Sequence, residues 1–138
     1  MSTETALYQR WINELWAGKP VAAELVSDDF VGHWPTRDIH GPDELRAMVD
    51  ETHQMLSELV FVVEHLLREL LAPEKINLAS LGNVVPHLHW HVIPRFTDDP
   101  HFPHSIWSAS VRERARPLPA GFARSLRLRL EERLGLKS

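Results

Sequence analysis

The sequence has no cysteine, which excludes a disulfide framework, a thiolate nucleophile and any cysteine-ligated metal site. It also has no uninterrupted apolar run that approaches the roughly 20 residues needed to cross a bilayer. The first residues lack the basic stretch followed by an apolar run that is typical of a signal peptide. We therefore expect a cytoplasmic protein with no membrane partner.

Positive charge is scarce in the first part of the chain and abundant in the second. Residues 1–74 carry 5 Lys and Arg against 14 Asp and Glu, whereas residues 75–138 carry 10 against 5. Such asymmetry can indicate a polyanion that binds the basic half. The simpler interpretation is that the halves attract each other or solvate their own surfaces, and we expect no nucleic-acid partner.

Apolar periodicity predicts several helices. Residues 4–17 and 20–27 are expected to form two short helices, and residues 120–134 a last amphipathic one. The most regular stretch is 43–71, whose apolar residues keep a three-four spacing and which Pro73 ends, so we expect one long helix. The alternative is a break at the β-branched run Leu59–Val63, which would then form a strand.

The residues after this helix alternate in the manner of strands. Residues 75–81 and 84–95 are expected to pair as an antiparallel hairpin around a Gly-Asn turn, followed by a loop over 97–106. The length of 138 residues fits one ordinary domain. We therefore predict a single α+β domain with a long central helix.

Three histidines alternate along the second of these strands. His87, His89 and His91 would share one face, while Leu88, Trp90 and Val92 share the other. An unpaired buried imidazole carries a desolvation cost, so the histidine face suits a cleft better than a core. The opposite face would anchor the strand, and we expect Trp90 to be a core residue.

Spacing alone leaves three interpretations of the histidine row. The middle imidazole could be a nucleophile toward phosphorus, with its neighbours orienting it and binding phosphate oxygens. The row could bind a metal ion, but the outer histidines lie roughly 13 Å apart at about 3.3 Å rise per residue, so His101 or His104 would be needed as well. The third interpretation is a set of surface imidazoles without chemistry.

The surrounding sequence favours the first interpretation. The stretch from Lys75 to Phe96, continuing through Asp98-Asp99-Pro100 to Trp107, closely resembles the bacterial histidine-triad (HIT) family. The resemblance implies a fold that is HIT-like in its second half. It also implies a metal-free and cofactor-free enzyme that hydrolyses or transfers a nucleotide through a covalent bond between its α-phosphate and a histidine. A purine nucleoside monophosphate derivative is the implied partner, and a homodimer is the implied assembly.

Family roles can be carried over position by position. The resemblance implies that His89 is the nucleophile, that His91 holds the phosphate, and that His87 orients His89 through hydrogen bonds. It places Asn77 and Asn83 where the family often has polar phosphate neighbours; ordinary turn and strand-end hydrogen bonding is the equally simple alternative. Trp107 matches the family's C-terminal segment and would contact substrate. In a dimer, this segment often reaches the site of the partner subunit.

The first half has a different resemblance. Residues 7–18, 28–35 and 40–45 are similar to the start of a SnoaL-like domain of the polyketide-cyclase type, and this similarity runs to about Glu64. We therefore interpret 1–55 as a mainly helical SnoaL-like segment and 56–138 as a HIT-like segment, folded together. Alternative functions are a SnoaL-like small-molecule binding or cyclase module and a chimeric scaffold without catalysis.

Overall fold

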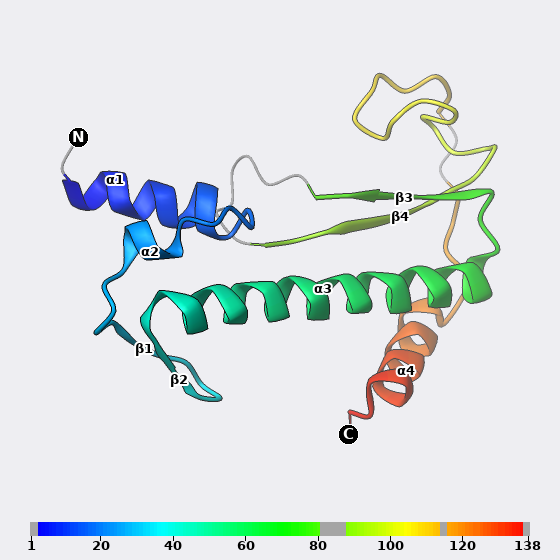
Figure 1. Ribbon diagram of the computed structural model, residues 1–138. Coiled ribbons are helices and arrows are strands. Elements are labelled where there is room, and N and C mark those ends of the chain that lie inside the picture. Colours follow the sequence, from blue (N-terminus) through cyan, green and yellow to red (C-terminus); the bar gives the residue numbers. More distant parts are fainter. Residues whose placement is uncertain (1–2, 81–87, 114–115, 137–138) are drawn as a thin grey trace. The chain divides into compact units, whose positions relative to one another are not determined.

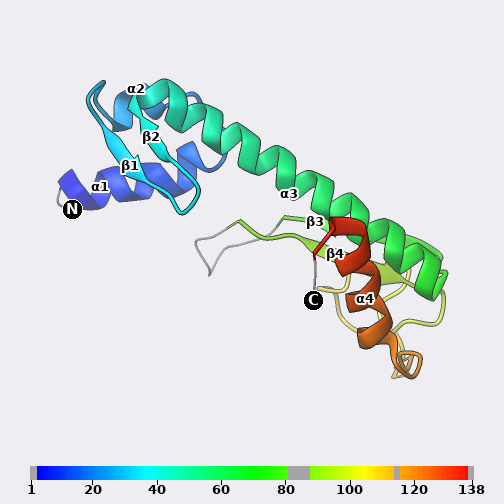
Figure 2. The ribbon, with the colours of Figure 1, turned by 90° about the horizontal axis from the view of Figure 1, so that it is seen from below.

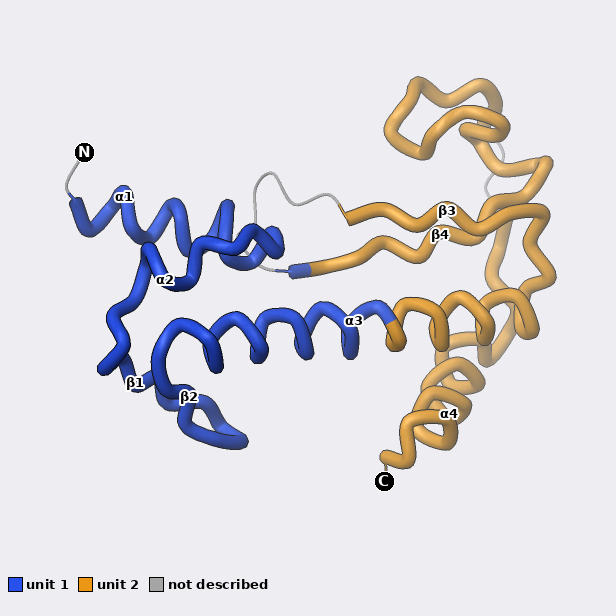
Figure 3. The backbone as a smooth tube through the Cα atoms, in the orientation of Figure 1, with its two compact units in different colours: residues 1–57, 82–88 blue, residues 58–81, 89–138 orange. Residues whose placement is uncertain are grey.

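A computed structural model describes residues 3–80, 88–113 and 116–136 (Figure 1). The chain divides into two compact units, one made of residues 1–57 and 82–88 and the other of residues 58–81 and 89–138 (Figure 3). Helices and strands occur in both, so the expected mixed composition is confirmed. That the two units fold together as one domain stays a prediction. In the described part of the chain, no helix is long and apolar enough to cross a membrane.

The first unit begins with the helix expected at its start. Helix α1 (Thr3–Arg10) continues into the π-helical turn η1 (Trp11–Leu15), and the chain turns at Gly18, whose φ is +79°. A short helix α2 (Ala22–Leu25) follows within the predicted 20–27 segment. Their apolar residues form the unit's core with residues from further along the chain: Leu15, Val21, Ala22, Ile39, Leu45, Met48 and Val49 are all buried.

A small hairpin in this unit was not predicted. Strands β1 (Val31–His33) and β2 (Asp38–His40) pair antiparallel, and Gly32 lies opposite the buried Ile39. A Cβ atom at Gly32 would collide with the ring of Trp34 and lie 2.9 Å from that of Phe30. Glycine at position 32 therefore leaves room for two aromatic rings beside the hairpin. The hairpin was not predicted because a strand of three residues is too short for alternation to be recognised.

The long central helix is confirmed. Helix α3 (Gly41–Leu71) runs without a break through residues 59–63, so the alternative of a strand there is wrong. Its apolar stripe keeps one phase along the whole length, and Leu45, Val49, Val60 and Leu66 along it are buried. The β-branched run stays helical because its side chains continue this stripe, and tertiary burial outweighs a weak local preference.

The second unit contains the predicted hairpin in a shorter form. Strands β3 (Lys75–Ala79) and β4 (His91–Arg95) pair antiparallel, with Lys75 opposite Arg95 and Ala79 opposite His91. The expected second strand over 84–95 was too long: residues 88–90 are described and are not in a strand, and 84–87 lie outside the described residues. In the part of the chain that is described, β3 and β4 pair only with each other.

The last helix is also confirmed. Helix α4 (Phe122–Leu134) ends at Gly135, whose φ of +64° allows the left-handed turn that closes a helix. It lies beside the end of α3 (Figures 1 and 2), where Arg129 and Arg133 both reach the carboxylate of Glu69 at 2.7 and 3.6 Å. The polar contacts of this unit thus join elements far apart in sequence.

Candidate active site

The β3–β4 hairpin has a polar face and an apolar face. Directly paired residues of antiparallel strands project to the same side, so Asn77 shares a face with Ile93, and Ala79 shares it with His91. Ile76 and Leu78 lie on the other face together with Val92. The hairpin therefore presents His91 and Asn77 on one surface, from a paired and regular element.

His89 and His91 come together at the start of β4. Their ring centroids are 5.4 Å apart and the ring planes meet at 84°, so the imidazoles pack edge to face. Both residues are half-buried. His89 precedes the strand, but its backbone carbonyl accepts a 3.3 Å hydrogen bond from the hydroxyl of Ser80. This hydrogen bond thus ties the backbone of His89 to the residue that follows β3, although His89 lies outside the paired strands.

Two of the other predicted site residues cannot be placed. His87 and Asn83 lie outside the described residues, and their implied roles stay predictions.

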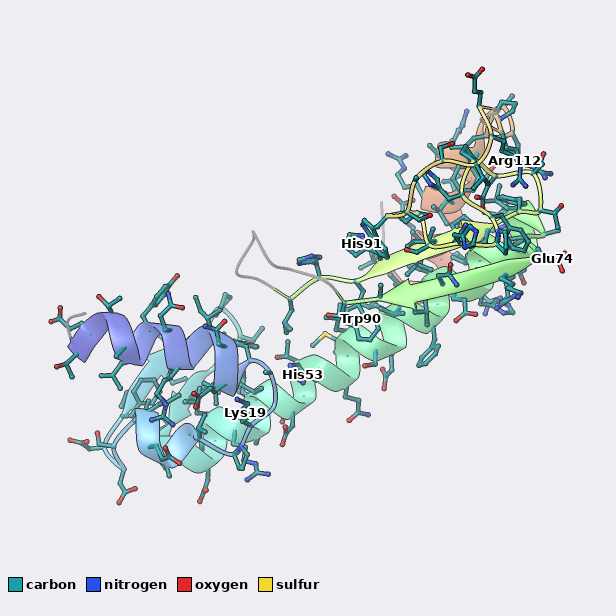
Figure 4. All side chains as sticks on the ribbon, turned by 90° about the horizontal axis from the view of Figure 1, so that it is seen from above. Lys19, His53, Glu74, Trp90, His91 and Arg112 are labelled. Atoms are coloured by element: carbon teal, nitrogen blue, oxygen red, sulfur yellow. The ribbon has the colours of Figure 1, made fainter. Side chains whose placement is uncertain are left out.

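Trp107 adds an aromatic ring to the two imidazoles. Its indole packs edge to face against His91, with ring centroids 5.8 Å apart and planes at 83°. The residue remains 56% exposed, so much of the indole surface is open to a ligand. His89, His91 and Trp107 form the histidine–tryptophan cluster. Figure 4 labels His91 at the start of β4, beside the loop that carries Trp107.

Trp90 does not have the expected core role. It is 41% exposed, and its position just before β4 places it beyond the paired part of the hairpin. The expected core position required a strand that begins at residue 84. Within the described residues, pairing begins at His91, so Trp90 has no paired partner in β3.

Asn77 has a structural partner. Its side-chain carbonyl accepts a 2.8 Å hydrogen bond from Nη1 of Arg95, which is 3% exposed. This is the strand hydrogen bonding that was the alternative to a phosphate role. The bond uses the Asn77 oxygen and leaves the amide NH₂ as the group that could donate to a phosphate.

Arg95 is the centre of a buried polar network that the sequence analysis missed. Its guanidinium donates to both oxygens of Asp99, at 2.8 and 3.1 Å, and to the backbone carbonyl of His104 at 2.7 Å. Asp99 also accepts bonds from the backbone N–H groups of Phe96, His101 and Phe102. The Arg95 guanidinium and these N–H groups hold the pKa of the Asp99 carboxyl well below its usual range.

The described residues do not bring together a set of ligands for the metal interpretation. Among the described residues, no group of three or more His, Asp or Glu side chains could hold a metal ion. His104 is exposed, and it contributes its backbone carbonyl to Arg95. His101 lies in the same loop, and its Nδ1 atom is buried and has no hydrogen-bond partner in the described structure. These two imidazoles were the extra ligands that a metal site would have needed.

Comparison with known proteins finds a match that includes both histidines of the cluster. Residues 35–98 match the HIT domain family. The HIT region thus contains α3, the β3–β4 hairpin and the histidine positions 87, 89 and 91, whereas Trp107 lies beyond it. No curated protein is significantly similar to the chain.

A solved structure is similar over part of its length. It is a crystal structure of a histidine triad (HIT) protein from Sinorhizobium meliloti, 35% identical, with a TM-score of 0.42. The match covers 57% of this chain and 56% of that one, so the chain spans about half the length of the HIT protein. A TM-score of 0.42 describes a partial superposition and does not establish a shared fold.

The family match corrects two sequence-based interpretations. The HIT region is the middle of the chain and not its C-terminal half, because the match begins at residue 35. It therefore includes residues 35–64, which had been assigned to a SnoaL-like domain, and the comparisons give that assignment no support. Among the described residues, the β1–β2 hairpin also pairs only within itself, and no further strand of a cone-shaped sheet joins it there.

Proposed function

We propose that the HIT region acts on a nucleotide α-phosphate through a covalent nucleotidyl-histidine intermediate on His89. The observation that carries the proposal is the edge-to-face packing of His89 and His91, 5.4 Å apart, inside the matched region. Two adjacent imidazoles give one group that attacks phosphorus and a second that donates to a phosphate oxygen.

The proposed reaction has two displacements at phosphorus. In the first, a ring nitrogen of His89 forms a bond to the α-phosphorus as the bond to the leaving group breaks, and the leaving group takes up the proton that the imidazole loses. In the second, the oxygen of water or another acceptor attacks the same phosphorus, the phosphorus–nitrogen bond breaks, and the imidazole regains the proton that the acceptor loses. Hydrolysis releases a nucleoside monophosphate and restores the imidazole, so no external oxidant or reductant is needed.

Neighbouring groups take the remaining roles. His91 holds the phosphate as it passes between acceptors, and the amide of Asn77 is available to donate to a phosphate oxygen. The exposed indole of Trp107 supplies an apolar surface on which a nucleobase stacks. The substrate class is a nucleoside monophosphate joined to a leaving group, with a purine as the expected base.

Substitution of the nucleophile tests the proposal. His89→Ala is expected to abolish hydrolysis of an adenosine phosphoramidate or dinucleotide, because no neighbour occupies the same point in space. His40→Ala, which removes an exposed imidazole from β2, is the control and should keep full activity. EDTA should have no effect on the wild type, since the reaction uses no ion. Activity of His89→Ala within a few-fold of wild type would overturn the assignment, and EDTA-sensitive activity restored by zinc would favour the metal interpretation.

One observation favours a second candidate, a binding domain without turnover. In the described residues β3 and β4 have no further strand beside them, so a nucleoside would meet few apolar walls. Such a domain would bind phosphate groups and release them unchanged. Nucleotide binding without any hydrolysis in the assay above would support this candidate over the first.

A further inference from the structure

The loop that follows β4 returns close to its own start. The backbone N–H of Val111 donates to the carbonyl of Pro100 at 2.8 Å, and the Ser110 hydroxyl contacts the same oxygen at 3.3 Å. The segment Phe96–Val111 is therefore a loop that folds back on itself, with Val111 bonded to Pro100. Trp107 lies on this loop, so whatever fixes the loop also fixes the indole beside His91.

Two arginines hold the loop, one just before it and one just after it. Arg95, the last residue of β4, binds Asp99 inside the loop and the carbonyl of His104. Arg112 donates from Nη1 to the carbonyls of Thr97, Asp99 and Phe102, at 3.3, 2.6 and 2.9 Å. Hydrogen bonds from a charged donor are stronger than neutral ones. Arg112 therefore restrains three backbone carbonyls (Figure 4 labels Arg112), and Arg95 restrains the Asp99 side chain and one carbonyl.

The restraint reaches Trp107 through a short turn. Arg95 fixes the carbonyl of His104, and the next residue, Ser105, begins a turn in which its carbonyl accepts from the N–H of Ser108 at 3.0 Å. The Ser105 hydroxyl also accepts a 3.3 Å bond from the backbone N–H of Trp107. Only two residues thus lie between His104, whose carbonyl Arg95 holds, and Trp107, whose indole contacts His91.

We propose that Arg95 and Arg112 are positioning residues that lock the Phe96–Val111 loop and so hold Trp107 against His91 in the same chain. The two arginines need not touch substrate, because they act on the backbone that carries the indole. This inference rests on the proposed function for its catalytic consequence, which is that the locked indole forms one wall of the nucleotide site. Stacking tolerates any base, so this wall contributes affinity with little base selectivity.

The lock can be tested without substrate by ¹⁹F NMR on protein labelled with fluorotryptophan. The chain has 5 tryptophans, and Trp107→Phe assigns the resonance of interest. His91→Gln should shift that resonance in the wild-type background, because the imidazole ring next to the indole is lost. In the Arg95→Lys background, His91→Gln should shift the Trp107 resonance by at most a small part of the wild-type amount. Lysine keeps the charge but cannot bind Asp99 at two points, so the indole is no longer held against residue 91.

Further variants keep the test decisive if Arg95→Lys does not fold. Asp99→Asn removes the charged partner of Arg95, and Arg112→Ala removes an exposed side chain that donates to three carbonyls of the loop. Both should weaken the effect of His91→Gln on the Trp107 resonance. Arg129→Lys, which changes an exposed ion pair to Glu69 on the same unit, is the control and should leave the full effect. The proposal would be overturned if His91→Gln shifted the Trp107 resonance by the full wild-type amount in Arg95→Lys, Asp99→Asn and Arg112→Ala alike.

Kinetics separate this inference from the proposed function. Arg95→Lys and Trp107→Ala are each expected to raise KM roughly tenfold with a much smaller change in kcat, because a stacking contact is lost while His89 is untouched. The double variant should be no worse than either single variant, since both remove the same contact. Absence of turnover in the wild type would contradict the proposed function, while the NMR result would still decide whether the lock exists. Additive losses in the double variant would contradict the lock.

Discussion

Arg95 and Asp99 form a two-point ion pair at the end of the histidine strand, with Nε to Oδ2 at 2.8 Å and Nη2 to Oδ1 at 3.1 Å. The arginine side chain is almost fully buried and the carboxylate is nearly so. The buried guanidinium of Arg95 is stable here because it is bonded to the side chains of Asp99 and Asn77 and to the carbonyl of His104. The Asp99 carboxylate in turn accepts hydrogen bonds from three backbone N–H groups. The pair therefore joins the strand that carries His91 to the loop that carries Trp107.

The pH dependence of stability should report this pair. The folded-state pKa of Asp99 lies below its unfolded value, so the pair stabilises the fold above the ordinary carboxyl range and loses that contribution as the pH falls through and below about 4. Asp99→Asn should thus lower the free energy of unfolding at pH 7, and the difference from wild type should shrink on acidification. Urea denaturation at a series of pH values measures this.

The neighbouring carboxylate provides the control for that measurement. Asp98 makes an exposed 3.4 Å ion pair with Arg116, and exposed pairs contribute little to stability. Asp98→Asn should therefore change the unfolding curves slightly at every pH. Equal and pH-independent losses in the two variants would show that the Arg95–Asp99 pair does not supply the acid-sensitive stability.

The continuity of α3 predicts a large effect of proline in its middle. Val60 is buried inside the helix, so Val60→Pro should cost roughly 3 kcal/mol or more, because proline removes a helical hydrogen bond and clashes with the preceding turn. Phe61→Ala, at an exposed neighbouring position, is the control and should have a small effect. Chemical denaturation followed by circular dichroism measures both variants. A loss for Val60→Pro no greater than that for Phe61→Ala would be incompatible with a continuous helix.

Nucleotide affinity should be weak and almost independent of the base. In the proposed reaction, His89, His91 and neighbouring amides would bind the phosphate, while Trp107 offers an exposed indole that contacts His91. We expect AMP to bind with a dissociation constant nearer 1 mM than 1 μM, or roughly −4 rather than −8 kcal/mol. Calorimetry with AMP, GMP and inorganic phosphate tests this. Tight and base-selective binding would show that another part of the chain builds a nucleoside pocket.

The sequence predicted the parts of the fold that long patterns specify. The three-four spacing from Leu45 to Leu70 was sufficient to identify α3, and alternation around residues 75–95 was sufficient to identify the hairpin. The β1–β2 hairpin was missed because each strand has three residues, too few for alternation to be recognised. Its stability comes from tertiary packing of Ile39 and of the rings around Gly32.

The sequence predicted that His89 and His91 lie together, but it did not predict the residues that support them. Histidine alternation brought His89 and His91 to one place, as the structure has them. The Arg95–Asp99 pair depends on how the loop after β4 folds back, which no local pattern determines. An arginine directly after an apolar strand, with an aspartate four residues later, was the available signal. Trp90 was misplaced because its burial depended on where pairing begins.

The central claim is that His89 becomes covalently bonded to a nucleotide phosphorus. Rapid quenching of the wild type during turnover of an adenosine phosphoramidate, followed by digestion under mildly alkaline conditions and mass spectrometry, measures this directly. We expect a peptide that gains one adenylyl group, fragment ions that place it on His89, and no adduct in His89→Ala. An adduct on His91, or turnover with no adduct at any histidine under conditions that preserve a phosphorus–nitrogen bond, would contradict it.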